Sequence, residues 1–352
     1  MRKFAVFSGF LGAGKTSAMM ALTRWHSAHR GKAAMISNDL GGQDLADNRL
    51  AQLSGCNASE LTGKCICDQR PKLMARLSEL FDGGCELVIS DIPGFGVGAL
   101  DHVYHALSAE YPGQTALAPF TVLTEPETVA FLQSGDDADL RYLMHAQLLE
   151  ADLIVLNKCD LLTQAQREAD AQYLKDRYPA SELLCISART GEGIEALSDA
   201  LMNGSASMRA PDPGCGGRQL RKSMSRMSEY NIQYRAVVCC DTFDGSAYLT
   251  ALAERVQADV RAAGQEIPHL KLLAWTPEGD YGKADLLGTR RAVELTHPFA
   301  LPCTDVAVIL NGSAACPSKT LDAIVTGAAE AVSKEFRLDM AVFRKECFGM
   351  GG

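Results

Sequence analysis

Residues 9–16 have the types and spacing needed to bind a phosphate group. They read G-x-x-x-x-G-K-T, between an apolar run at residues 3–8 and a helical pattern at residues 17–22. Glycines let the backbone curl so that several N–H groups face one anion, and the start of the helix adds its positive end. Lys15 can reach the β- and γ-phosphates, and the Thr16 hydroxyl can bind Mg2+. The sequence therefore predicts a P-loop whose nucleotide-binding residues are Gly9, Gly12, Ala13, Gly14, Lys15, Thr16 and Ser17.

Two acidic residues directly follow short apolar runs that read as strands of one sheet. Asp39 comes after the second run, and Asp91 begins the sequence D-x-x-G, which ends at Gly94. In an open α/β sheet, ligands bind beyond the carboxyl ends of the strands. GTPases with a P-loop place there a carboxylate for Mg2+ and a glycine that senses the γ-phosphate. We therefore expect Asp39 to orient the attacking water, although a simple turn would also explain that loop. The predicted catalytic residues are Lys15, Asp39 and Asp91, and the predicted Mg2+ ligands are Thr16, Asp39 and Asp91.

A third motif can distinguish guanine from adenine. Residues 157–160 read N-K-C-D and follow a buried-type strand. The carboxylate of Asp160 can accept hydrogen bonds from the N1–H and 2-amino groups of guanine, a donor pair that adenine lacks. Asn157 would tie this loop to the P-loop, and the Lys158 stem would lie along the base. The motif disfavours an ordinary metabolic kinase, and the S-A-R sequence that supports the base is Ser187, Ala188 and Arg189.

A C-x-C-D sequence at Cys65, Cys67 and Asp68 lies between the two acidic motifs. Two thiolates on a short loop lose little freedom when they bind a transition metal, but two ligands do not complete a site. Asp68, Cys56, Cys85 or a histidine would have to supply the rest. A pair of reduced, half-buried thiols is the alternative. We keep both interpretations and treat Cys65, Cys67 and Asp68 as candidate transition-metal ligands.

The composition excludes several classes of partner. The chain has 352 residues, 47% of them hydrophobic and 22% charged, which is ordinary for a globular protein of two domains. A net charge of −9 gives no overall support for nucleic-acid binding. No apolar run is long enough to span a bilayer, and the N-terminal glycines read as a P-loop rather than a signal peptide. We therefore expect a cytoplasmic protein without a membrane partner, whose 12 cysteines are thiols or metal ligands.

Hydrophobic periodicity predicts two domains joined by a linker. Residues 1–203 read as a P-loop NTPase domain, an α/β fold with a mostly parallel sheet flanked by helices, in which residues 115–124 form one strand. Residues 204–229 are rich in small and basic residues and read as a linker, although their basic run would also fit a solvated helix turn or a partner-docking segment. Residues 230–352 mix strands with two helices, which predicts a smaller α+β domain of ferredoxin-like outline. We interpret the isolated histidines and cysteines of that domain as structural.

Taken in chain order, these motifs resemble those of the CobW/HypB/UreG group of P-loop GTPases. The opening S-G-F-L-G-A-G-K-T and the position of the C-x-C loop are especially similar to CobW-like proteins. The resemblance covers residues 1–202. It implies GTP and Mg2+ as ligands and slow GTP hydrolysis, coupled to delivery of a metal such as Zn2+ or Co2+ or to maturation of a metalloenzyme or a cobalamin-related protein. Asp68 stands where CobW-like proteins have a third cysteine, which makes the donor set harder.

The resemblance also implies partners. These are a client metalloenzyme or corrinoid-related protein, and a second copy of the chain in a nucleotide-dependent homodimer. An alternative function keeps the GTP switch but not the metal. In that case the protein is a chaperone or activator of a corrinoid or other metalloenzyme, and the thiols of the C-x-C loop are redox-active or inert.

Overall fold

The computed structural model of the chain describes residues 2–39, 46–94, 96–210, 217–239, 241–288 and 291–350. The chain divides into two compact units. The first comprises Met1–Leu40 and Ser54–Ser223, and the second comprises Gly41–Leu53 and Met224–Gly352. A short segment from the N-terminal half of the chain is therefore grouped with the C-terminal unit, which the sequence did not indicate.

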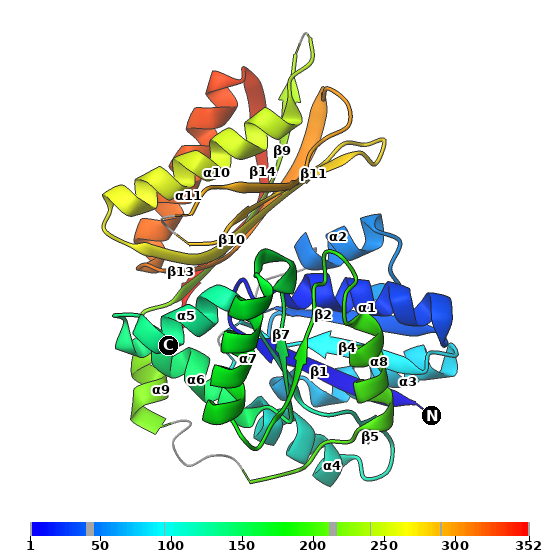
Figure 1. Cartoon of the computed structure of the whole chain (residues 1–352). Helices are drawn as coiled ribbons and strands as arrows, with labels where there is room; N and C mark the ends of the chain where they lie inside the picture. Colours follow the sequence, from blue (N-terminus) through cyan, green and yellow to red (C-terminus); the bar gives the residue numbers. More distant parts are fainter. Residues whose placement is uncertain are drawn as a thin grey trace. The chain divides into compact units, whose positions relative to one another are not determined.

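The first unit is built on a parallel sheet with the strand order β3-β2-β4-β1-β6-β7-β8, and β5 also pairs with β1 (Figure 1). The strands of this sheet pair in parallel, so the strands that carry the acidic and guanine motifs end at one edge. This confirms the predicted P-loop NTPase fold. The strands are β1 (Lys3–Gly9), β2 (Ala33–Asp39), β3 (Ala58–Thr62), β4 (Leu87–Asp91), β5 (Ala116–Leu117), β6 (Thr121–Thr124), β7 (Leu153–Leu156) and β8 (Glu182–Cys185).

Helices connect these strands and bury their apolar residues against the sheet. The alternate residues Phe4 and Val6 of β1 belong to one core cluster with Leu73 and Leu77, which lie four residues apart on α3. The helices are α1 (Lys15–His29), α3 (Arg70–Asp82), α4 (Ala106–Glu110), α5 (Pro126–Ser134), α6 (Ala138–Glu150), α7 (Gln164–Arg177), α8 (Ile194–Asn203) and α9 (Gly217–Met224). Short 3-10 turns occupy Ile66–Asp68 and Cys159–Leu161, and a π-helical turn occupies Leu100–His105.

One local prediction for this unit was wrong. The single strand expected at residues 115–124 is divided into β5 and β6, and Pro119, which has no N–H to donate to a sheet, lies between them. The region expected to be a linker contains α9 (Gly217–Met224), and its basic residues Arg218, Arg221 and Lys222 are exposed to solvent, as in the solvated helix turn that the sequence left open.

The second unit is an antiparallel sheet with the order β12-β11-β10-β13-β9-β14. Four of its strands and both of its long helices occur in the chain as β9-α10-β10-β13-α11-β14, and the order of these four strands in space confirms the predicted ferredoxin-like topology. The pair β11 and β12, an insertion between β10 and β13, extends one edge. The strands are β9 (Ser228–Val238), β10 (Glu266–Trp275), β11 (Tyr281–Leu286), β12 (Glu294–His297), β13 (Asp305–Ala315) and β14 (Leu338–Gly349), and the helices are α2 (Ala46–Leu53), α10 (Gly245–Ala262) and α11 (Ser318–Glu335).

The two faces of this second sheet differ in chemistry. Leu270 and Leu272 of β10 point into an apolar core that includes residues of α10 and α11, the helices along one face (Figure 1). The alternate residue Lys271 lies on the other face, where its Nζ is 2.5 Å from Asp47 Oδ2 of α2. The Arg49 guanidinium lies 5.0 Å from the centre of the Trp275 ring, a cation–π contact. These polar contacts attach α2 to the second unit.

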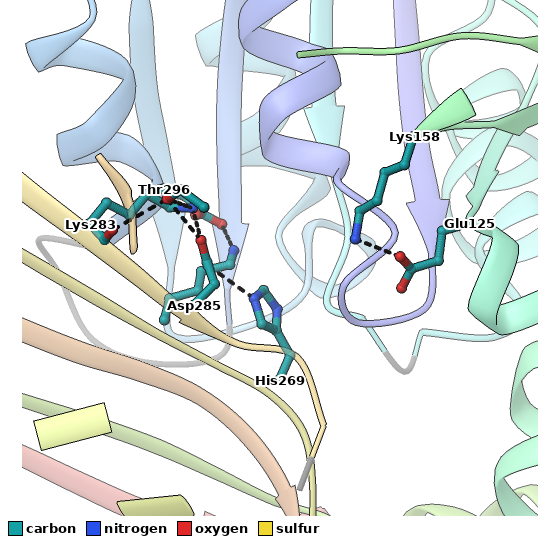
Figure 2. A network of polar contacts seen from close by, with 8 residues as sticks. Glu125, Lys158, His269, Lys283, Asp285 and Thr296 are labelled. Carbon is teal, nitrogen blue, oxygen red and sulfur yellow. Dashed lines mark hydrogen bonds and ion pairs between the residues drawn. The ribbon is translucent and has the colours of Figure 1, made fainter. Parts of the chain in front are cut away.

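A buried ionic network lies on the same face (Figure 2). Asp285 is 4% exposed, accepts a hydrogen bond from Thr296 Oγ1 at 3.2 Å, pairs with Lys283, and lies 3.3 Å from His269 Nε2. Burial lowers the pKa of His269 to about 4, so its imidazole is neutral at pH 7. The network supports the interpretation of His269 as structural. Within the described residues, no helix combines the length and the apolar character that crossing a bilayer requires.

Candidate nucleotide-binding site

The P-loop lies between β1 and α1 and is shaped by its glycines. Gly12 and Gly14 both have φ of 84°, a left-handed conformation that side chains other than glycine rarely adopt. A Cβ on Gly9 would lie 2.2 Å from the carbonyl oxygen of Leu123 in β6, so only glycine fits there. The Ala13 N–H donates to the Phe10 oxygen at 3.2 Å and closes the turn. The loop thus has the tight curvature that a phosphate cradle needs.

The lysine and threonine at the start of α1 take positions that suit their predicted roles. Lys15 Nζ donates to the Gly9 oxygen at 2.7 Å, so the ammonium folds back over the loop. Thr16 is buried and Ser17 is exposed. The positions of Lys15, Thr16 and Ser17 are consistent with the roles in nucleotide and Mg2+ binding that the sequence predicts for them, and these roles stay predictions.

The carboxylate at the end of β4 is connected to the neighbouring strand. Asp91 is buried, and its Oδ1 accepts the backbone N–H of Asn38 in β2 at 2.7 Å. Gly94, three residues further on, lies against the P-loop, because a Cβ there would be 2.4 Å from Leu11 Cδ2. The D-x-x-G segment and the P-loop are therefore adjacent. Asp39 ends β2, but its side chain lies outside the described residues.

Asn38 links this carboxylate to the loop that carries the thiols. Its side chain is 4% exposed, and Nδ2 donates to the oxygens of Leu61 at 2.8 Å and Lys64 at 2.9 Å. Its Oδ1 accepts the N–H of Ile66, the residue between the two cysteines, at 2.9 Å. One buried side chain thus fixes the C-x-C loop from both sides, while its own backbone is held by Asp91.

The two thiols of this loop contact each other. Cys65 Sγ accepts the N–H of Cys67 at 3.4 Å, and the Cys67 thiol makes hydrogen bonds with Cys65 and Asp68. The hydrogen bond from Cys67 lowers the pKa of Cys65, whereas the same bond, burial and Asp68 raise the pKa of Cys67. Among the described residues, no three His, Cys, Asp or Glu side chains are arranged to hold a metal ion. The assignment of Cys65, Cys67 and Asp68 as metal ligands stays a prediction.

The guanine motif contacts the P-loop directly. Asn157 is fully buried, and its Nδ2 donates to the Ala13 oxygen at 3.0 Å. A Cβ on Gly14 would lie 2.4 Å from the same Nδ2, so the two loops meet at van der Waals distance. Asn157 Oδ1 accepts the N–H of Ala188 at 3.0 Å. One asparagine therefore holds together the phosphate loop and the two segments predicted to bind the base.

The carboxylate predicted to recognise guanine is held by the S-A-R segment. Ser187 Oγ donates to Asp160 Oδ1 at 2.6 Å, and Arg189 Nη2 lies 2.5 Å from Oδ2. The Arg189 side chain is mostly exposed, so it can leave this contact at little cost. The arrangement places Asp160, Ser187 and Arg189 in one cluster, as the sequence predicted.

Lys158 is anchored by an acidic residue that the sequence analysis did not identify. Its backbone is left-handed, with φ of 62°, and its Nζ lies 2.5 Å from Glu125 Oε2 (Figure 2). Glu125 is buried immediately after β6, at the carboxyl edge of the sheet. The ion pair fixes the direction of the lysine stem, which is the part expected to lie along the base.

In the described part of the chain, three buried side chains hold loops of this site without belonging to a nucleotide-binding motif: Glu125, Gln147 and Glu150. The available signal was weak. Gln147 and Glu150 are polar residues beside apolar ones on α6, and Glu125 follows a strand that carries no known motif. Each acts through contacts with segments that are distant in sequence.

This fold and this arrangement define a P-loop protein of the GTPase class, because a phosphate loop and an N-K-x-D loop meet at the carboxyl edge of a parallel sheet. The family model described as "CobW/HypB/UreG, nucleotide-binding domain" matches residues 3–183. The chain belongs to this family of GTPases, which confirms the resemblance seen in the motifs.

Comparison with individual proteins gives more distant matches. The small ribosomal subunit biogenesis GTPase RsgA of Haemophilus influenzae (strain PittGG) is 44% identical over 68 residues, which are 19% of this chain and 20% of that protein. The chain thus spans about a fifth of the length of that relative. The hydrogenase maturation factor HypB from Archaeoglobus fulgidus is 18% identical, with a TM-score of 0.40 over 57% of this chain and 89% of that chain. Zn(II)-bound YjiA GTPase from E. coli is 12% identical, with a TM-score of 0.38 over 93% of this chain and 98% of that chain.

Proposed function

We propose that this protein binds GTP with Mg2+, hydrolyses it slowly, and couples its nucleotide state to metal delivery or to maturation of a metalloenzyme or cobalamin-related enzyme. Family membership and the meeting of the P-loop with the N-K-x-D loop support the nucleotide half. The observation that carries the coupling is the double contact of Asn38, through its backbone to Asp91 and through its side chain to the C-x-C loop.

The nucleotide chemistry depends mainly on position and charge. Lys15 would neutralise charge on the β- and γ-phosphates, and Asp160 would select guanine. Thr16 and Asp91 would hold Mg2+, which supplies further charge neutralisation when it is bound. Asp39 stays the residue predicted to orient the attacking water. With no other group assigned to activate that water, we expect slow intrinsic turnover.

The coupling follows from one hydrogen bond to the Mg2+ carboxylate. If Asp91 holds Mg2+ when GTP is bound, a change in the position of its carboxylate would be passed to the Asn38 backbone, because this carboxylate accepts the Asn38 N–H. The Asn38 side chain, which holds the Lys64 carbonyl and the Ile66 N–H on either side of Cys65, would then move with the backbone or release these groups. Nucleotide state changes metal affinity only if the metal binds one arrangement of the thiols more tightly than the other.

The cargo would be a transition metal such as Zn2+ or Co2+, which thiolates bind well. Cys65 and Cys67 supply two thiol donors, and Asp68 supplies a carboxylate in hydrogen-bond contact with Cys67. A set of two thiolates and one carboxylate binds less tightly than three thiolates, which suits a metal that must be passed on to a client protein. A second copy of the chain, brought by GTP, could complete the coordination.

The test of the nucleotide half is calorimetric titration with GTP and ATP. GTP should bind more tightly, and Asp160→Ala should weaken GTP by about a hundredfold, because two hydrogen bonds to a charged group are lost. If ATP binds more tightly than GTP, or if the variant keeps full GTP affinity, the assignment is wrong.

The test of the metal half is Zn2+ and Co2+ affinity with GDP and with guanylyl imidodiphosphate. The affinities should differ between the two nucleotides, and Cys65→Ser/Cys67→Ser should abolish binding at this loop. The matched control is Cys85→Ser/Cys316→Ser, which removes two buried thiols elsewhere. A Cys65→Ser/Cys67→Ser variant with unchanged metal stoichiometry would exclude delivery through this loop.

The second candidate function is a GTP-switched chaperone or activator of a corrinoid or other metalloenzyme that binds no metal itself. The hydrogen bond between Cys65 and Cys67 favours this second function, because the two thiols already have a hydrogen-bond partner in the absence of a metal. It predicts equal, negligible metal content of the freshly purified protein with GDP and with GTP. In this case the client enzyme would bind according to nucleotide state alone.

A further inference from the structure

Helix α6 carries two buried polar side chains that the proposed mechanism does not yet use. Gln147 is 1% exposed and Glu150 is 4% exposed, and their spacing of three residues puts them on the same face of the helix. Leu143 and Met144 of α6 are also buried. Polar groups buried this deeply need partners, so the segment that supplies them is held in a defined place.

Gln147 contacts the D-x-x-G loop through both hydrogens of its amide. Its Nε2 donates to the Gly94 oxygen at 3.0 Å and to the Gly96 oxygen at 3.1 Å. The Gly96 N–H in turn donates to the Pro93 oxygen at 2.8 Å, so Gly96 is also linked to the residue that precedes Gly94. Gly94 also lies against Leu11 of the P-loop, so it is held between the phosphate loop and α6.

Glu150 holds the far end of the same loop. Its carboxylate accepts the N–H groups of Gly98, Ala99 and Leu100, the last at 3.3 Å. Gln147 therefore binds carbonyl groups at the start of the loop, and Glu150 binds N–H groups at its end. The side chains of one helix face thus fix the loop at two points, and neither belongs to a nucleotide-binding motif.

One atom of this arrangement is left unsatisfied. Among the described residues, no group forms a hydrogen bond with Gln147 Oε1, although the atom is buried. A buried acceptor without a partner raises the free energy of the state that contains it. A bound nucleotide that brings a donor of the loop to this oxygen would lower that free energy.

We propose that Gln147 is a positioning residue that holds Gly94 where it recognises the γ-phosphate, so that it sets the preference for GTP over GDP. The inference rests on the proposed GTPase function and extends it to a residue that touches no part of the nucleotide. GDP lacks the γ-phosphate that Gly94 would recognise. The remaining groups of GDP are expected to be bound by the P-loop and by the segments that Asn157 holds together. Gln147 therefore strengthens GTP binding and supports GTP hydrolysis, and it does not affect GDP binding.

The test compares affinities for guanylyl imidodiphosphate and for GDP, together with kcat and KM for GTP. In Gln147→Met, which keeps the size of the side chain but cannot donate, the affinity for the GTP analogue should fall about tenfold, as expected for the loss of buried hydrogen bonds. The GDP affinity should stay within about twofold of the wild-type value. A lower kcat should accompany the loss, because Gly94 would act in the transition state as well.

A second variant and a control distinguish positioning from simple stability. Gln147→Glu places an oxygen opposite the Gly94 and Gly96 carbonyls, so it should weaken the GTP analogue more than Gln147→Met does, again without effect on GDP. Gln172→Met, on the exposed surface of α7, should change neither affinity. An equal loss of both nucleotides, or a GTP preference that stays unchanged in both Gln147 variants, would overturn the proposal. Failure of the wild-type protein to bind either guanine nucleotide would instead overturn the proposed function, and this inference with it.

Discussion

Replacement of Asn38 by alanine is the most direct test of coupling between the nucleotide site and the thiol loop. The substitution removes three side-chain hydrogen bonds, of 2.8, 2.9 and 2.9 Å, to Leu61, Lys64 and Ile66. It keeps the backbone N–H that donates to Asp91, so the nucleotide site loses no direct contact. The perturbation therefore falls on the C-x-C loop alone.

The magnitude follows from the number of bonds. Each contributes about 0.5–1.5 kcal/mol, so the loop should lose about 2–4 kcal/mol of local stability. A local opening that is easier by this amount speeds amide hydrogen exchange by about two orders of magnitude. The best reporter is the Ile66 amide, because its hydrogen-bond acceptor is the Asn38 side chain itself.

The assay is hydrogen exchange of Ile66, measured with GDP and with guanylyl imidodiphosphate. Wild-type protein should show different rates with the two nucleotides, whereas Asn38→Ala should show one fast rate with both. The control is Gln69→Ala, which removes bonds to the Thr62 and Lys64 oxygens but has no link to Asp91. Gln69→Ala should speed exchange yet keep its nucleotide dependence. If exchange in Asn38→Ala is unchanged, or still depends on the nucleotide, the coupling route is wrong.

Three further predictions concern charge and reactivity near the site. Burial raises the pKa of Glu150 from 4.5 to about 7. Between pH 4.5 and pH 7 the folded protein therefore binds one more proton than the unfolded chain. Stability should therefore fall by up to about 3 kcal/mol as the pH rises through this range, and denaturation of Glu150→Gln at pH 5 to 8 should lack this dependence. Glu125→Gln weakens the ion pair with Lys158, so calorimetry should show that the affinities for GTP and for GDP both fall about fivefold. Unequal losses of the two affinities would contradict this role of Glu125. The hydrogen bond from Cys159 lowers the pKa of Cys185 to about 6, so iodoacetamide at pH 7 should modify it faster than the buried Cys85, as peptide mass spectrometry can check.

The parts of the site formed by consecutive residues could be predicted from the sequence. The glycines at 12 and 14, the lysine after them and the start of α1 lie in one short segment, so their geometry depends on local backbone preferences. The same holds for the N-K-x-D loop, in which the residue types carry the chemistry. The helical pattern at residues 17–22 likewise lies within α1, because consecutive residues without an internal break form it.

The grouping of α2 with the second unit could not be predicted in this way. Residues 46–53 lie between β2 and β3 in the chain, and their sequence reads like any short helix of the first unit. What places them is the contact of Asp47 with Lys271 and of Arg49 with Trp275. Contacts over more than two hundred residues leave no trace in local periodicity.

The sequence by itself therefore determined the class of fold and the family, and it predicts the residues that touch GTP, because each motif carries its own chemistry in a short segment. The tertiary structure alone decided that Asn38 connects Asp91 to the thiol loop and that Gln147 holds Gly94. The physical reason is that these side chains bind backbone carbonyl and N–H groups, which every residue carries alike. Which backbone groups a buried amide meets is settled only when the strands and helices have packed.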